Sequence, residues 1–280
     1  MTHGARERTT QAVILARGLG TRMRRDEAAA DAALSDEQRR AAARGAKGMM
    51  PLGARPFLDY VISALADAGI RDVTLVVSPE AEEIREHFAR THVPQRVSVR
   101  FAVQAEPRGT ADAVYSAHDT LYDAPFLVLN SDNFYPVAAY RDLAEVGASG
   151  LVAFEADTLV RESRLEPERV FKFALLDIGD DDILRSVREK PAADDPLARR
   201  AERWVSMNLW SFSPVIFEAC ARVRPSARGE LEIQDAVTIA MRELGEPFHV
   251  VRMRAGVLDM SSRADIAFVA SQLEGIEPRP

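Results

Sequence analysis

The sequence predicts an α/β fold: a Rossmann-like, three-layer arrangement in which helices cover a mostly parallel sheet. Strand-like and helix-like patterns alternate from residue 11 to about residue 154, which is typical of such a sheet. The first strand pattern, Val13–Leu15, is a short apolar run of the kind found in a central parallel strand. A chain of 280 residues with 47% hydrophobic content can also bury the core that this fold needs.

Hydrophobic spacing defines the other elements of the first half. Residues 57–68 place apolar side chains at helical spacing, and Gly69 stands where a helix stop is expected. The remaining patterns are strands at 73–77, 97–103 and 126–129, and helices at about 79–90 and 110–118.

The second half of the chain is less regular. Val170–Leu176 and Ile183–Arg188 flank a turn at 179–182, which predicts a hairpin. Trp204–Phe212 is a further strand pattern, and Ser213-Pro214 predicts a helix start with a cap residue and a proline in the first turn. A capping-box pattern at 262–265 predicts a final helix with Ile266, Val269 and Leu273 on its apolar face.

Residues 24–44 differ in composition from their surroundings. They are rich in alanine and charge and lack a large apolar stripe, which predicts an exposed helix. A surface insertion is the simplest interpretation, and a lid or an oligomer contact is the alternative.

Composition excludes several classes of protein. A net charge of −7 without charged blocks argues against a nucleic-acid partner. One cysteine rules out an internal disulfide, and Cys220 stands in an apolar stretch that predicts burial. No apolar run approaches the roughly 18 residues of a membrane span, and residues 1–10 lack a signal core, so we expect a cytoplasmic protein with a flexible N-terminus.

The strand at 13–15 leads directly into a glycine loop. Gly18 and Gly20 let backbone N–H groups approach an anion, while Thr21 adds a hydroxyl and Arg22 a permanent positive charge. A dinucleotide fingerprint would need glycine where Met23 stands, and no G-x-x-x-x-G-K-[ST] run exists. The pattern therefore favours a phosphate-binding loop, with a plain glycine turn as the alternative.

This loop and five later motifs resemble the sugar nucleotidyltransferase family, most closely its thymidylyl- and uridylyltransferases. The resemblance runs over roughly residues 11–275, and its later motifs lie at 47–58, 103–113, 129–133, 188–191 and 225–233, followed by an aspartate at 259. It implies the nucleotide-diphosphosugar transferase fold in one domain at 11–275. Within it, residues 11–154 would bind the nucleotide and a smaller subdomain at 155–260 mainly the sugar phosphate, with 24–44 as a helical insertion.

The resemblance also implies a role for individual residues. Asp132 and Asp259 would hold Mg²⁺, a cation that takes hard oxygen ligands. Arg22 and Lys47 would neutralise the departing pyrophosphate, and Lys190 and Arg228 would hold the sugar phosphate. The expected sugar contacts are Glu189, Asn208 and Glu230, and the expected nucleotide contacts are Leu15, Ala16, Gly18, Gly20, Thr21, Gln104, Gly109, Thr110 and Asn130.

Several of these residues have a purely structural alternative. Asp132 is also placed to cap a helix near Pro136, and Asp259 to cap the last helix. Lys190 is also readable as an exposed charge at a strand end, and Glu230 as a surface carboxylate.

The implied reaction joins UTP or dTTP to a sugar 1-phosphate by in-line attack on the α-phosphate, giving a nucleotide sugar and pyrophosphate. The run Gly109–Ala113 also resembles ADP-glucose enzymes, so a purine nucleotide, or phosphocholine as the acceptor, is an alternative. A catalytically silent regulatory protein that binds nucleotide sugar is an alternative of another class. The sequence departs from the family at Arg17, Lys172, 206–210 and 260–262, so it does not identify the acceptor sugar. It also leaves open whether the protein forms a homo-oligomer.

Overall fold

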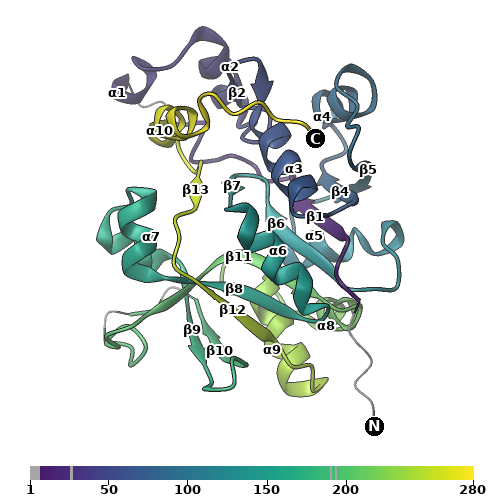
Figure 1. Ribbon diagram of the computed structural model, residues 1–280, viewed down its shortest axis with the longest axis vertical. Helices are drawn as coiled ribbons and strands as arrows, with labels where there is room; N and C mark the ends of the chain where they lie inside the picture. Colours follow the sequence, from purple (N-terminus) through teal and green to yellow (C-terminus); the bar gives the residue numbers. More distant parts are fainter. Residues whose placement is uncertain (1–6, 26–27, 190, 193) are drawn as a thin grey trace.

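Within the described residues, nine strands form one mixed sheet with a parallel centre (Figure 1). The computed structural model describes residues 7–25, 28–189, 191–192 and 194–280. The parallel strands are β1 (Gln11–Leu15), β4 (Asp72–Val77), β5 (Ser98–Val103) and β6 (Phe126–Asn130), in the spatial order β6-β1-β4-β5. Leu15 pairs in register with Val76 and with Asn130, so three of these strands end at one edge.

The second half of the chain extends this sheet with antiparallel strands. β11 (Trp204–Phe212) runs antiparallel to β6, to β8 (Gly150–Glu155) and to β9 (Ala174–Ile178). β10 (Leu184–Arg188) continues from β9, and β12 (His249–Met253) lies parallel to β8. The short pairs are β2 (Pro51–Leu52) with β3 (Arg55–Pro56), and β7 (Asn133–Phe134) with β13 (Leu258–Asp259).

Two hydrophobic cores lie on opposite faces of the sheet, which gives the three layers that the sequence predicts. Along β1, Ala12 and Ile14 belong to one core and Val13 to the other. The first core packs under α3 (Phe57–Asp67), α6 (Val137–Val146), α7 (Ala156–Ser163) and α10 (Arg263–Leu273). The second packs under α5 (Thr110–Tyr115), α8 (Val215–Arg222) and α9 (Ile233–Glu243).

Most of the predicted elements are present, including the final helix with Ile266, Val269 and Leu273 buried. The predicted helix at 79–90 is α4 (Glu82–Glu86) followed by a π-helical turn, η1 (His87–Thr91), and a 3₁₀ turn, η2 (His118–Thr120), follows α5. Cys220 is buried, as expected, and burial raises the pKa of its thiol to about 12.

Two local predictions were wrong. The first strand of the hairpin begins only at Ala174, because Pro167 opens a 3₁₀ turn, η3 (Pro167–Lys172), that occupies the preceding residues. Ser213 does not cap α8: its hydroxyl donates to Glu246 Oε1 at 2.6 Å, and Pro214 occupies the cap position.

Residues 24–44 form two short helices rather than one. α1 (Ala28–Asp31) lies beside α10 (Figure 1), and α2 (Asp36–Arg44) begins at a capping box on Ser35 and ends at Gly45, which has φ of +73°. Ala41 and Ala42 of α2 are buried, so this helix packs partly into the core.

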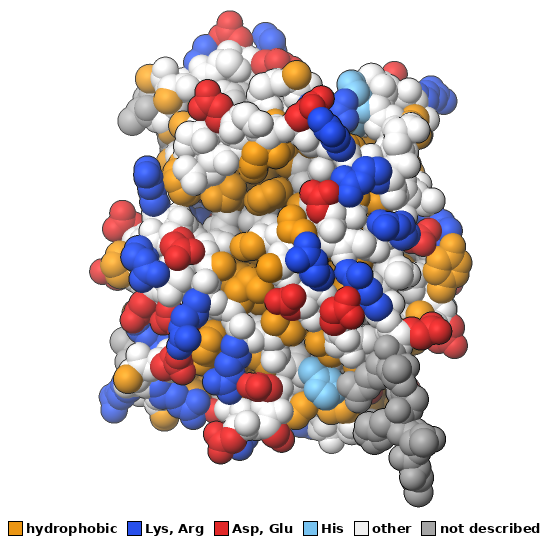
Figure 2. Space-filling view, viewed as in Figure 1, with side chains coloured by type: hydrophobic (Ala, Val, Ile, Leu, Met, Phe, Trp, Pro, Cys, Tyr) orange, Lys and Arg blue, Asp and Glu red, His pale blue; other side chains and the backbone are white. Residues whose placement is uncertain are grey.

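The described surface carries mixed charge. On the face in Figure 2, acidic and basic side chains are interspersed. Among the described residues, every helix is too short or too polar to cross a membrane.

Candidate active site

A cavity of about 810 Å³ opens at the carboxyl ends of β1, β4 and β6. Open α/β sheets commonly bind their ligands at this edge. The cavity brings together the glycine loop after β1, the 104–113 segment, the end of β6 and the segment 44–49. Every predicted nucleotide contact lines it, namely Leu15, Ala16, Gly18, Gly20, Thr21, Gln104, Gly109, Thr110 and Asn130.

The glycine loop is packed against the end of α2. Gly20 has φ of +61°, and a Cβ atom there would lie 2.4 Å from Gly45 O, so only glycine fits. Arg17 lines the cavity, and its guanidinium donates to Gln104 O at 2.8 Å and to Ala105 O at 3.0 Å. The arginine that departs from the family pattern therefore ties the glycine loop to the 104–113 segment.

Arg22, the predicted loop cation, is exposed on the surface. It is not one of the described residues that line the cavity, and among the described residues it forms no ion pair. Thr21, the residue before Arg22, and Lys47, the other predicted cation, both line the cavity.

Gln104 is 3% exposed, and its side-chain amide is held in one orientation. Nε2 donates to Gly109 O at 3.0 Å and to Asp112 Oδ2 at 2.8 Å. Since both partners only accept hydrogen bonds, the nitrogen must face them. The group that Gln104 can offer to a ligand in the cavity is therefore its Oε1, an acceptor.

Close contacts join the 104–113 segment to the 225–233 motif. Gly109 has φ of +122°, and a Cβ atom there would lie 2.4 Å from Leu231 O. Thr110 Oγ1 accepts from Ile233 N at 2.9 Å, and Ala111 N donates to Leu231 O. These contacts place Glu230 in the cavity lining.

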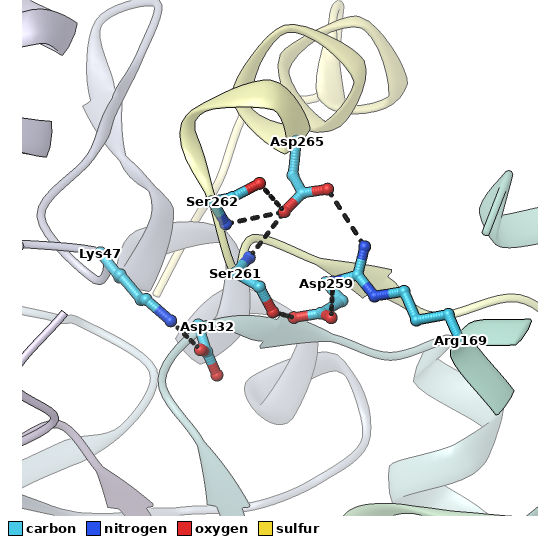
Figure 3. Close-up of polar contacts among 7 residues, drawn as sticks. All are labelled: Lys47, Asp132, Arg169, Asp259, Ser261, Ser262 and Asp265. Carbon is cyan, nitrogen blue, oxygen red and sulfur yellow. Dashed lines mark hydrogen bonds and ion pairs between the residues drawn. The ribbon is translucent and has the colours of Figure 1, made fainter. Parts of the chain in front are cut away.

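The two predicted metal ligands lie at a pair of adjacent strands: Asp132 directly precedes β7, and Asp259 is in β13. β13 pairs with β7, which sets Asp259 opposite Asn133, and Met260 N donates to Asp132 O at 2.9 Å. Asp132 Oδ2 is 2.7 Å from Lys47 Nζ, and Asp259 Oδ2 is 2.7 Å from Arg169 Nη2 (Figure 3).

The environment of Asp259 suits a divalent cation. Burial raises the pKa of its carboxyl group, and the negative charge of Asp132 raises it further, while Arg169 lowers it. A divalent cation held by the two carboxylates would add to the positive charge that Arg169 and Lys47 bring there. Among the described residues there is no cluster of three or more metal-ligating side chains, so the remaining ligands would be phosphate oxygens and water.

Neither carboxylate has the capping role that was its alternative. Pro136 occupies the cap position of α6 without a side-chain bond. α10 is capped by the Ser262–Asp265 box, whereas Asp259 accepts from Ser261 Oγ at 2.6 Å.

Of the predicted sugar-side residues that the structure describes, only Glu230 lines the cavity. Arg228 is exposed and pairs with Glu232 at 2.8 Å, a contact that raises the pKa of its guanidinium. Asn208 sits at an irregularity of β11 with φ of +61°, and its Oδ1 accepts from Gln234 Nε2 at 3.1 Å. Glu189 is exposed, and Lys190 lies outside the described residues.

The structure adds residues that the sequence did not single out. Arg169 pairs with both Asp259 and Asp265, Asp112 orients Gln104, and Arg24 and Arg44 line the cavity. Arg169 is 90 residues from Asp259 in the chain, and no local pattern marks such a partner.

A phosphate-type glycine loop, an oriented amide and a carboxylate pair at one sheet edge define a nucleotide-binding α/β protein. The profile of the family described as "Nucleotidyl transferase" matches residues 42–255. The chain therefore belongs to the nucleotidyl transferase family.

Curated relatives support this assignment. A glucose-1-phosphate thymidylyltransferase of Streptomyces griseus is 31% identical over 81% of this chain and 56% of its own length. A UTP–glucose-1-phosphate uridylyltransferase of Haloferax volcanii is 27% identical over 91% of this chain and 93% of its own. The chain spans about half the length of several other relatives that it matches.

Solved structures share the fold. A UDP-glucose pyrophosphorylase complexed with UDP-glucose has a TM-score of 0.71 at 15% identity, covering 94% of this chain and 98% of its own. A UTP-bound UGPase from Acinetobacter baumannii has a TM-score of 0.71 at 18% identity, covering 96% and 95%. At such identities the likeness shows the fold alone.

Proposed function

We propose that this protein joins UTP or dTTP to a sugar 1-phosphate and releases pyrophosphate. The observation that carries the proposal is the cavity at the carboxyl edge of the sheet. It gathers every predicted nucleotide contact together with Lys47 and Asp132, and the backbone pairing at β7 and β13 sets Asp259 beside them. The names of the matched relatives point to the same chemistry.

In the proposed reaction, a phosphate oxygen of the sugar 1-phosphate attacks the α-phosphorus of the nucleotide. A new P–O bond forms, the bond to the β-phosphate oxygen breaks, and pyrophosphate leaves with the electron pair. The attacking phosphate is already anionic near neutral pH, so no general base is needed. Catalysis then depends on alignment and on positive charge near the leaving group, which Lys47 supplies from the cavity wall.

Asp132 and Asp259 would hold Mg²⁺ if the metal binds here. When bound, it would neutralise phosphate charge. The neighbouring side chains keep the two carboxylates in place: Lys47 contacts Asp132, while Arg169 and Ser261 contact Asp259.

The preference for uracil or thymine rests on Gln104. With Oε1 available as an acceptor, it can receive the N3–H of either base, whereas N3 of cytosine carries no hydrogen. The N–H groups of guanine and adenine could reach the same acceptor, so purine nucleotides belong in the test.

We assign the acceptor sugar phosphate mainly to residues 155–260, with Arg228 and Glu189 at its edge. The electrostatic influence of Glu189 and Glu230 on Arg228 supports their proximity. We include Lys190 as a further contact of the sugar phosphate, on the basis of the sequence resemblance alone.

The direct test is Mg²⁺-dependent pyrophosphate release. UTP, dTTP, CTP, ATP and GTP are each combined with a panel of sugar 1-phosphates and with phosphocholine. We expect release with UTP or dTTP and one sugar 1-phosphate, and loss of release in a Lys47→Met variant. A strong signal only with a purine nucleotide or only with phosphocholine would overturn the substrate assignment. Silence with every pair, while UTP still binds, would favour a regulatory nucleotide-sugar-binding protein.

A further inference from the structure

The segment 24–44 is attached to the site at several points rather than standing apart on the surface. Gly20 of the phosphate loop abuts the backbone of Gly45, which ends α2. Arg263 donates to Met23 O at 2.9 Å and to both carboxylate oxygens of Asp31 at 2.7 and 2.8 Å. The segment therefore joins the phosphate loop to the helix that follows Asp259.

Both ends of this segment bring a guanidinium to the cavity. Arg24 and Arg44 line it, and Arg24 Nε donates to Arg44 O at 3.2 Å. Arg24 lies over Gly45, where a Cβ atom would be 2.7 Å from Arg24 Nε. Glycine is required at position 45 for two reasons: the backbone there is left-handed, and a side chain would take the space that Arg24 occupies.

The cationic side chains that line the cavity differ in how their charge is used. Lys47 pairs with Asp132, and Arg44 pairs with Glu83 at 3.2 Å. Arg17 donates to two backbone carbonyls. Arg24 lines the same cavity and makes its hydrogen bond to Arg44 O through Nε, so within the described residues its terminal nitrogens take no part in an ion pair.

We propose that Arg24, held in place by Gly45 and backed by Arg44, binds the terminal phosphates of the nucleoside triphosphate and the pyrophosphate derived from them. This inference rests on the proposed function, which supplies a triphosphate to this cavity. It makes Arg24 and Arg44, the two ends of the segment, a part of the substrate site. A guanidinium suits the task because it is always charged and can donate two parallel hydrogen bonds to a phosphate.

The test compares Arg24→Gln and Arg24→Lys with the wild type. Arg40→Gln is the matched control, because Arg40 is exposed on α2, carries the same charge and is not among the described residues that line the cavity. Calorimetry measures the binding of magnesium pyrophosphate, steady-state kinetics measure KM for each substrate, and thermal melting checks the fold.

We expect Arg24→Gln to weaken pyrophosphate binding and raise KM for the nucleotide by about 10- to 100-fold, the loss of a charge-assisted hydrogen bond. KM for the sugar 1-phosphate should stay within about twofold, and Arg24→Lys should recover part of the loss. Arg40→Gln should behave like the wild type.

Equal pyrophosphate affinity in Arg24→Gln and Arg40→Gln, with both folded, would overturn the inference. A wild type that binds pyrophosphate through Arg24 but turns over no nucleotide would instead contradict the proposed function. Because calorimetry needs no turnover, the two failures are distinguishable.

Discussion

Gln104 donates its side-chain amide to Asp112 Oδ2 at 2.8 Å, and this contact, together with the one to Gly109 O, turns Nε2 away from a ligand in the cavity. Asp112 is eight residues further on, in the first turn of α5. If Gln104 reads the base as we propose, the carboxylate acts on the base through Gln104 without touching it.

Replacing Asp112 by Ala should weaken the discrimination between UTP and CTP. Without the carboxylate, Gly109 O is the remaining acceptor of Nε2, so the Gln104 amide can turn more readily and offer Nε2 to N3 of cytosine. We expect the ratio of kcat/KM for UTP over CTP to fall about tenfold, the scale of one hydrogen bond to a charged or buried polar group. Arg108→Gln is the control, since Arg108 is exposed and lies 3.8 Å from the same carboxylate. A ratio that stays constant in Asp112→Ala would contradict this role.

Replacing Lys47 by Met should remove most of the activity. Lys47 Nζ is the cavity-lining ammonium that we assign to the leaving phosphates, and loss of one pre-positioned charge typically costs about 10²- to 10³-fold in rate. Lys47→Arg should retain part of the rate because the charge remains. Steady-state kinetics at saturating Mg²⁺ measure both. Full activity in a folded Lys47→Met protein would show that another cation serves the leaving group.

Chelation of divalent metal by EDTA should abolish pyrophosphate release, and added Mg²⁺ should restore it. Asp132→Asn and Asp259→Asn should each raise the Mg²⁺ concentration for half-maximal activity by at least about tenfold, because a carboxylate ligand is lost.

Asp265→Asn provides the comparison for these metal variants. Asp265 lies in the same cluster but accepts from Ser261 N, Ser262 N and Ser262 Oγ, so it caps α10 (Figure 3). The Asp265→Asn substitution should lower the unfolding free energy by about 1 kcal/mol without changing the Mg²⁺ requirement. An identical Mg²⁺ requirement in all three variants and the wild type would argue against a metal at Asp132 and Asp259.

Arg263→Met should destabilise the protein markedly. Arg263 is 3% exposed, and its bonds to Met23 O and Asp31 are lost together. We expect a loss of about 3 kcal/mol in urea unfolding, which is typical of breaking a buried pair.

Arg254→Met serves as the surface reference for this stability experiment. Arg254 and Glu202 form an exposed pair, for which a loss of less than about 1 kcal/mol is expected. In Arg263→Met, protease cleavage within 24–44 should also become faster, because α1 loses its contact with α10. A stability equal to that of Arg254→Met would show that the segment is held by other contacts.

Local chemistry explains what could be predicted. The run Val13–Leu15 marks a central strand because both faces of that strand are covered, and Gly20 marks a tight approach because no other residue fits there. The Ser262 capping box was visible because it spans only four residues. The cap prediction failed because Ser213 has a partner far away in the sequence: its hydroxyl donates to Glu246 instead of capping α8.

The sequence by itself determined the α/β class and the order of the motifs, since both depend on the short-range spacing of apolar residues and glycines, and its resemblance to the family pointed to the predicted nucleotide contacts that line the cavity. Only the tertiary structure decided which charges meet. It set Arg169 on Asp259, Asp112 on Gln104 and Arg24 at the cavity, which Arg22 does not line among the described residues. The physical reason is that a charge selects its partner by distance and burial in the folded chain, and neither quantity is written in the local sequence.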